Sequence, residues 1–369
     1  MKIENSHQLL VLAVAPLPPP VDGASATSEE ILKFLKTKAL VRAANMSAGR
    51  FSGWARHPAR TFKTLSAIAL LFRHAVNKNR VLYMTADGGH GMIYNILTAT
   101  AGTLLRYRVF LHHHSFAYAD RSTLWMALLS RILKRSGTHV VLCSKMENDL
   151  RARYPIGRTI ELSNAAFLPP EPECKRDRHN MSKGPLKLGF LSNLIIEKGL
   201  DTSIELFSAA KAEGLDVELV IAGPATDLKA LEFIDEGRSR LGKTLTYLGP
   251  LYHEEKSAFL NEIDVLLFPS RYFNEAQPRV VLESLSFGRP VLTIARGCIT
   301  SDMGKGSGLC ARYSNSFVAE ALPILRAWVK HPEQLNEASN IAKARSEELY
   351  LSGRRHLENL AQAMALPKG

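Results

Sequence analysis

One stretch of the chain, residues 263–292, constrains the fold more than any other. It reads IDVLLFPSRYFNEAQPRVVLESLSFGRPVL. The apolar run Ile263–Phe268 predicts a buried strand, and Pro278 stands where a helix can begin, because its fixed φ suits a first helical turn. Gly288 ends that helix, and Pro290 precedes a second apolar run. A strand, a loop, a helix and a strand in this order predict a parallel βαβ unit.

Two carboxylates belong to this unit. Glu275 lies in the loop and Glu283 lies inside the expected helix, eight positions further on. Open α/β sheets bind their ligands at the carboxyl ends of the strands, so both side chains are expected to face a ligand site there. By themselves they are also compatible with the acid/base pair of a hydrolase.

The same alternation of strands and helices runs through most of the chain. One series begins with the apolar run Gln8–Ala15 and another with Leu186–Leu191. Between them lies a segment rich in proline and charge, without periodicity, which is typical of a linker. We therefore expect an N-terminal domain over residues 1–172, a linker over 173–185, a second domain over 186–345 and a C-terminal helix over 346–369 that packs back on the first domain.

Two local expectations belong to this assignment. The segment from Thr27 to about Ala44 is expected to form one helix after the proline-rich turn. The glycines between Gly297 and Gly308 are expected to form a flexible segment.

Composition narrows the class of protein. The 369 residues are too many for one ordinary core and suit two domains. No two of the four cysteines have C-x-x-C spacing, no signal peptide is apparent, and no apolar run approaches the ~20 residues that span a bilayer. The glycine-rich turn Gly88–Gly91 fits no nucleotide fingerprint. We expect a cytoplasmic protein, peripheral on the inner face of the cell membrane.

Positive charge is concentrated in the N-terminal half. Residues 1–170 contain 22 Lys or Arg and 9 Asp or Glu, and no acidic residue lies between Glu30 and Asp87. Aromatic residues alternate with basic ones here, so we expect Arg56, Arg60 and Lys63 to form a membrane or acceptor surface. A solvated helix packed on the sheet explains the pattern equally well. Nucleic acid is disfavoured because no recognition module accompanies the charge.

Two further positions in this half are candidates for ligand contacts. Gly23 follows a proline-rich loop at a helix start, where backbone N–H groups can bind an anion or a sugar, although a plain turn is the simpler explanation. His112, His113 and His114 end a predicted strand. They alternate in direction and have no Cys, Asp or Glu at ligand spacing, so one histidine directed into a cleft is favoured over a metal site.

Four sequence elements together resemble the retaining glycosyltransferases of family 4. The segment Glu275–Glu283 is similar to their E-x7-E motif, and Gly189–Gly199 is similar to their strand–loop element ending in Lys-Gly. Val220–Pro224 and Tyr247–Pro250 match two further landmarks. The likeness is strong over residues 186–312 and looser over residues 1–170.

The resemblance implies the GT-B architecture, in which two doubly wound, Rossmann-like parallel-sheet domains face each other across a cleft. The first domain would bind the acceptor and the second a nucleotide-sugar. The resemblance makes Glu275 and His114 catalytic, near the donor sugar, and Glu283 the ligand of the ribose hydroxyls. Lys198 would neutralise the diphosphate, so that neither a metal nor another cofactor is needed. The remaining donor-binding candidates are Asn193, Gly23, Ala276, Gln277 and Pro278.

Two departures from the family pattern bear on this assignment. Asn193 stands where the family usually has an arginine, which removes one positive charge that the basic excess of the N-terminal half, Arg271 or Arg296 would have to replace. Gln277 and Pro278 stand in place of Phe-Gly. The expected activity is transfer of a hexose to a lipid-linked acceptor in surface polysaccharide or glycolipid synthesis. The alternatives are an inactive GT-B-like subunit that binds a partner glycosyltransferase and a sugar epimerase.

Overall fold

The structure is a computed structural model that describes residues 9–20, 23–47, 56–134, 137–168, 184–225, 227–312 and 316–366. The chain divides into two compact units, one of residues 1–167 with 352–369 and one of residues 168–351. Most of the expected linker 173–185 lies outside the described residues. Within the described part of the chain, no helix is long and apolar enough to cross a membrane.

The N-terminal unit is built on a parallel sheet of six strands in the order β2-β1-β3-β4-β5-β6. The strands are β1 (Leu10–Ala15), β2 (Leu40–Asn45), β3 (Arg80–Ala86), β4 (Arg108–His113), β5 (Thr138–Val141) and β6 (Arg158–Glu161). The helices are α1 (Gly23–Lys36), α2 (Arg56–Arg73), α3 (Met92–Leu104), α4 (Ala117–Asp120), α5 (Leu124–Leu133) and α6 (Ser144–Arg153).

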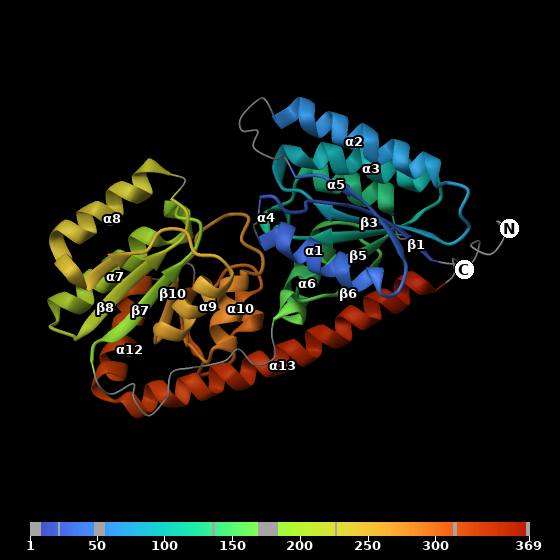
Figure 1. The fold of residues 1–369 in the computed structure, drawn as a ribbon. Helices are drawn as coiled ribbons and strands as arrows, with labels where there is room; N and C mark the ends of the chain where they lie inside the picture. Colours follow the sequence, from blue (N-terminus) through green and yellow to red (C-terminus); the bar gives the residue numbers. More distant parts are fainter. Residues whose placement is uncertain are drawn as a thin grey trace. The chain divides into compact units, whose positions relative to one another are not determined.

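Helices cover both faces of this sheet. Figure 1 shows α2, α3 and α5 side by side on one face, with α1 and the end of the long helix α13 (Pro332–Ala365) on the other. The core on the α1 side joins strand residues such as Tyr83 to Leu357, Leu360 and Met364 of α13, all fully buried. On the opposite face, α3 lies close to β3, because a Cβ on Gly102 would come within 2.5 Å of the Leu82 side chain.

The C-terminal unit contains a second parallel sheet of six strands, in the order β12-β11-β10-β7-β8-β9. The strands are β7 (Leu186–Leu191), β8 (Val217–Ala222), β9 (Leu245–Tyr247), β10 (Val265–Phe268), β11 (Val291–Ile294) and β12 (Gly308–Ala311). The helices are α7 (Leu200–Ala212), α8 (Leu228–Leu241), α9 (His253–Glu262), α10 (Arg279–Ser286), α11 (Ile299–Asp302), α12 (Phe317–Lys330) and the first part of α13. Two doubly wound parallel sheets confirm the predicted fold class.

Two edge strands were not predicted. The expected helix Thr27–Ala44 ends at Lys36, and Leu40–Asn45 forms β2, whose residues are partly or fully exposed and therefore show no apolar alternation. The segment after Gly297 contains α11 and β12 and is not simply flexible. Gly308 has a φ of +133°, and a Cβ there would lie 2.1 Å from the Val291 carbonyl oxygen. This glycine serves close strand packing.

Buried histidines connect the central strands of the N-terminal unit. His112 Nδ1 lies 2.7 Å from the Tyr83 hydroxyl, and His113 bridges the Tyr118 hydroxyl and His139 Nδ1, each at 3.0 Å. Burial and the neighbouring histidines lower the pKa of His112 and of His113 well below the usual value. Burial and the charge of Arg151 lower the pKa of His139 to about 4. All three are therefore neutral at pH 7.

These histidines make stability depend on pH. Their pKa values are lower in the folded state, so their contribution is complete above the unfolded pKa of 6.5 and is lost as pH falls below it. We expect the free energy of unfolding to fall by up to about 1.4 kcal/mol per histidine for each pH unit below 6.5. Urea denaturation at pH 7.5, 6 and 5 measures it. His112→Gln should flatten the profile, whereas His90→Gln, at an exposed position, should not. Equal slopes in both variants would contradict this account.

Candidate active site

The candidate site lies where the strand order of the C-terminal sheet reverses. β7 has β8 on one side and β10 on the other. From β7 the chain first adds β8 and β9 on one side of the sheet, and then adds β10, β11 and β12 on the opposite side. Open α/β sheets bind ligands in the crevice outside the carboxyl ends of such strands. The loop after β7 carries Lys198, and the loop after β10 carries Glu275. The predicted basic and acidic residues thus emerge from neighbouring strands.

Lys198 and Glu275 form an ion pair across these two loops. The Lys198 Nζ lies 2.6 Å from Glu275 Oε2, and the Ser270 hydroxyl donates to the same oxygen at 2.9 Å. The Lys198 ammonium also lies 4.6 Å from the centre of the Tyr272 ring. Both charged side chains are largely buried, with exposed fractions of 17% and 8%. Such a pair is held firmly in place, because separating it without a new partner would leave a buried charge uncompensated.

A glycine brings the two loops together. Gly199 directly follows Lys198, has a φ of +89° and precedes α7. A Cβ at this position would lie 2.3 Å from the carbonyl oxygen of Pro269, in the loop after β10. Gly223, after β8, plays a similar part, because its Cβ would lie 1.7 Å from the Ser192 carbonyl oxygen. Glycine is needed wherever backbones approach this closely.

Glu283 is paired with a cation that the sequence did not single out. Its Oε2 lies 2.5 Å from Lys256 Nζ on α9, and its Oε1 lies 3.7 Å from Arg279 Nε. The buried Arg289 donates to the carbonyl oxygens of Leu260 and Asn261 at 3.0 and 2.9 Å. Arg289 therefore fixes the end of α9, the helix that presents Lys256.

The residues that follow Glu275 are tightly held. The Cys298 N–H donates to the Ala276 carbonyl at 2.7 Å, and a Cβ on Gly297 would lie 2.2 Å from the same oxygen. Gln277 is buried and its amide donates to Asp302 Oδ1 at 2.7 Å. Pro278 is the N-cap of α10, as the sequence indicated. This leaves the backbone, more than the Gln277 side chain, to meet a ligand.

The missing positive charge at Asn193 is not replaced by either arginine considered above. Asn193 is exposed. Arg271 donates to both carboxylate oxygens of Asp201, at 2.9 and 2.7 Å, and also to the Thr202 hydroxyl. Arg296 donates to the Tyr272 and Phe273 carbonyl oxygens. Arg271 is thus held by side chains of α7, and Arg296 by the backbone of the loop after β10.

Gly23 and His114 belong to the N-terminal unit. Gly23 is exposed and starts α1, and a Cβ there would meet nothing within 4 Å. His114 follows β4 and is partly buried, with its ring 4.1 Å from that of His112. Their roles remain predictions. Among the described residues, no group of three His, Cys, Asp or Glu is arranged to hold a metal ion.

Two of the three predicted surface cations point into the fold. Arg60 is paired with Asp87, and its guanidinium lies 4.9 Å from the Tyr94 ring centre. Burial raises the pKa of Asp87, and the charge and hydrogen bond of Arg60 offset part of that rise. Lys63 donates to the Ser47 carbonyl oxygen. The side chain of Arg56 lies outside the described residues. Arg60 and Lys63 are therefore not free surface charges.

Comparison with known proteins shows which family the C-terminal unit resembles. Residues 173–343 match the family described as glycosyl transferases group 1. The match lies within the C-terminal unit of the chain, which therefore resembles this family over that region. A GDP-mannose-dependent alpha-(1-6)-phosphatidylinositol dimannoside mannosyltransferase of Mycobacterium tuberculosis is 29% identical over 45% of the chain and 41% of its own length. Alpha-D-kanosaminyltransferase of Streptomyces kanamyceticus is 26% identical over 48% and 50%. The chain thus spans about half, or less, of the length of each of these curated relatives.

Solved structures match nearly the whole chain in fold. Sucrose-phosphate synthase from Thermosynechococcus elongatus has a TM-score of 0.73 at 15% identity and covers 97% of this chain and 99% of its own. HepE of Anabaena, solved with UDP-glucose, has a TM-score of 0.70 at 15% identity and covers 96% and 100%. This confirms the predicted GT-B class, and the resemblance to family 4 is confirmed by the group 1 match.

Three side chains of the site were missed from the sequence. Ser270 stands shortly after the buried run Ile263–Phe268, where a serine is an ordinary loop residue and gives no sign of a site. Tyr272 and Lys256 gave no signal, because an aromatic residue in a loop and a lysine on a mostly polar helix are common on surfaces. Only the fold brings Tyr272 to Lys198 and Lys256 to Glu283.

The close approach at Gly199 can be tested by substitution. Gly199→Ala should lower the free energy of unfolding by at least about 3 kcal/mol, because left-handed strain of about 1–2 kcal/mol adds to the clash with Pro269. Gly214→Ala is the matched control, since its φ is +74° but its Cβ would meet nothing within 4 Å. Its free energy of unfolding should fall only by the left-handed strain of about 1–2 kcal/mol. Urea denaturation measures both, and equal losses would contradict the proposed loop contact.

Proposed function

We propose that this protein is a retaining glycosyltransferase that moves a hexose from a nucleotide-sugar donor to an acceptor. The observation that carries the proposal is the Lys198–Glu275 ion pair at the switch point of the C-terminal sheet, inside the group 1 domain. The retaining outcome follows from the resemblance to family 4.

The chemistry of the reaction accounts for the cations. Breaking the bond between sugar and diphosphate leaves negative charge on the phosphate and positive charge on the sugar. Lys198 lies one residue before Gly199, the N-cap of α7, and α10 begins in the loop that contains Glu275. Helix N-termini bind anions through their free N–H groups and positive dipole ends. Lys198 and these N-termini would stabilise the leaving diphosphate without a metal ion.

The carboxylates of Glu283 and Glu275 would contact different parts of the donor. Glu283 would accept hydrogen bonds from the ribose hydroxyls, with Lys256 keeping its carboxylate in position. Glu275 would lie beside the donor sugar. When Lys198 turns toward the diphosphate, Glu275 loses its main countercharge and is left to face the positive charge that develops on the sugar. His114 would contact the same sugar near its anomeric carbon.

The acceptor is proposed to be lipid-linked, in the synthesis of a surface polysaccharide or glycolipid at the inner face of the cell membrane. The mycobacterial relative is named for a phosphatidylinositol dimannoside substrate, which supports a lipid carrier. The N-terminal unit, with its excess of Lys and Arg over residues 1–170, would bind it.

Substitution of the ion pair tests the site. Glu275→Ala and Lys198→Ala should each lower nucleotide-sugar turnover by a factor of about 100 or more, because each removes transition-state stabilisation. Arg326→Ala is a matched control, since it breaks an exposed pair with Glu213 in the same unit, also at 2.6 Å. Turnover is measured as released nucleoside diphosphate. Wild-type rates in both site variants would disprove the assignment.

One observation favours a second candidate function. Asn193 brings no charge, and Arg271 and Arg296 are engaged with Asp201 and with backbone carbonyls. A chain with this weaker diphosphate site would fit an inactive subunit that binds a partner glycosyltransferase.

Calorimetry with UDP, GDP, ADP and CDP in excess EDTA separates the two. We expect one nucleoside diphosphate to bind without metal and Lys198→Ala to weaken it at least tenfold, because the lysine is the main cation at the pair of loops. Binding of none of them, with or without Mg²⁺, would favour the inactive subunit. Binding only after Mg²⁺ is added would show that the positive side chains do not suffice.

A further inference from the structure

The outer surface of the α2–α3–α5 layer carries large apolar side chains exposed in regular stripes. On α2 they are Phe62 and Leu65, exposed by 72% and 60%, and Phe72, exposed by 61%. Their spacing of three and seven residues places them on one side of a helix. The opposite side of α2 carries the buried Ala67 and Leu71 that face the sheet. Both sides of this helix are therefore apolar.

The neighbouring helices continue the surface. α3 packs between α2 and α5. Its exposed apolar residues are Ile93, Leu97 and Leu104, and those of α5 are Leu124 and Leu128. Leu104 and Leu124 are 77% and 88% exposed. We call these eight side chains, together with Val76 after α2, the apolar face. Single exposed apolar residues are ordinary, but adjoining stripes on three helices mark an interaction surface.

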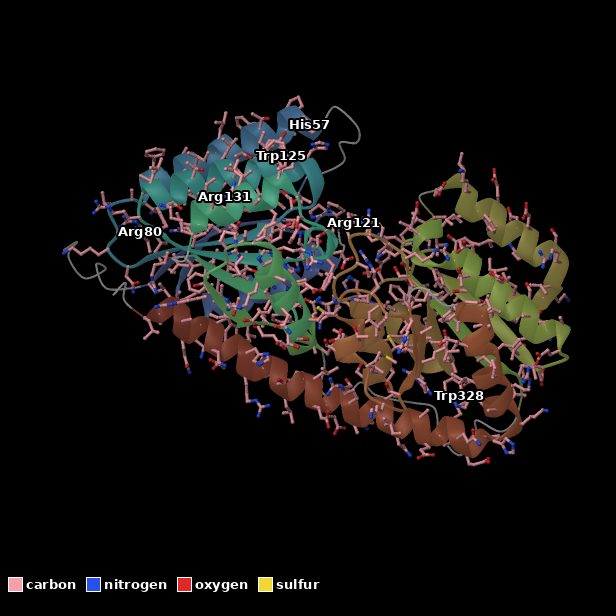
Figure 2. The ribbon with its side chains drawn as sticks, turned by 180° about the vertical axis from the view of Figure 1, so that it is seen from behind. His57, Arg80, Arg121, Trp125, Arg131 and Trp328 are labelled. Atoms are coloured by element: carbon pink, nitrogen blue, oxygen red, sulfur yellow. The ribbon has the colours of Figure 1, made fainter. Side chains whose placement is uncertain are left out.

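Charge on this layer is almost entirely positive. Residues 56–134 contain eleven Lys or Arg and two acidic residues, of which Asp87 is paired with Arg60. Five exposed cations have no ion pair among the described residues. They are Arg73, Lys78, Arg106, Arg131 and Lys134. Each lies at or just beyond the C-terminal end of α2, α3 or α5, and Figure 2 shows Arg131 and Trp125 on α5 and His57 on α2.

This combination favours one kind of partner. Cations at helix C-termini are stabilised by the helix dipole, but the dipole does not explain the apolar stripes. A protein partner would have to be both apolar and strongly acidic. An anionic bilayer offers both properties at once, since its acyl region accepts apolar side chains and its phosphates attract Lys and Arg.

We propose that the apolar face docks on an anionic lipid bilayer, with Phe62, Leu65 and Phe72 entering the interface and the five cations contacting lipid phosphates. The surface differs from the one expected from the sequence, because Arg60 and Lys63 are engaged inside the fold. Delivery of a lipid-linked acceptor to this face rests on the proposed function. Docking itself does not.

Vesicle flotation with the full chain tests the proposal. We expect the protein to float with phosphatidylcholine vesicles that contain 30% phosphatidylglycerol and to bind pure phosphatidylcholine at least tenfold more weakly. The triple variant Phe62→Ser, Leu65→Ser, Phe72→Ser should lose at least tenfold in binding to the anionic vesicles. Replacing the five cations by Gln should remove the preference for phosphatidylglycerol, and salt should weaken wild-type binding.

A matched control uses three exposed apolar residues of the C-terminal unit, Leu228, Phe233 and Leu351, each replaced by Ser. It should bind vesicles as the wild type does. Undiminished binding of the Phe62, Leu65, Phe72 variant would overturn the proposal. So would a dimer in analytical ultracentrifugation that this variant abolishes while vesicle binding persists, because the face would then join two copies of the chain. Nucleoside diphosphate binding, followed in the same variants, should stay unchanged. Its failure in the wild type would count against the proposed function alone.

Discussion

The candidate site depends on how closely two loops approach each other at the switch point of the C-terminal sheet. Gly199 lets the loop after β7 come against the Pro269 carbonyl after β10, and the ion pair between Lys198 and Glu275 joins the same two loops. We expect each arrangement to support the other. A side chain at Gly199 would separate the charges, and a missing partner would leave one charge buried without compensation. The fold thus fixes the distance between the cation proposed for the leaving group and the carboxylate proposed for the sugar.

Much of this was predictable because the relevant signals are local. The buried strand β7 is a short, mostly apolar run, and Leu186–Leu191 was predicted with the bounds that the structure shows. Pro278 marked the start of α10 for a backbone reason that holds in any fold. That Lys198 and Glu275 belong to one site was expected only from the family resemblance, since 77 residues separate them in the chain, and their direct pairing was not predicted.

What the sequence did not disclose depends on contacts between distant segments. Edge strand β2 has exposed residues on both faces, so no periodicity marks it. The sequence pattern predicted Lys63 and Arg60 as surface charges, but in the structure Lys63 binds the Ser47 carbonyl oxygen and Arg60 pairs with Asp87. Conversely, Leu65 and Phe72 look like core residues in a helical pattern and prove to be exposed. Amphipathicity gives the faces of a helix but not which face meets the sheet when both are apolar.

The N-terminal unit is discontinuous, because its core is completed by Leu357, Leu360 and Met364 from the end of α13. During synthesis, residues 1–167 emerge long before these three. Until the last helix is translated, α1 alone cannot complete the cover of this face, and the apolar surface that will contact α13 stays open to solvent or to chaperones. The order of translation therefore makes the first unit to be synthesised the last to complete its core.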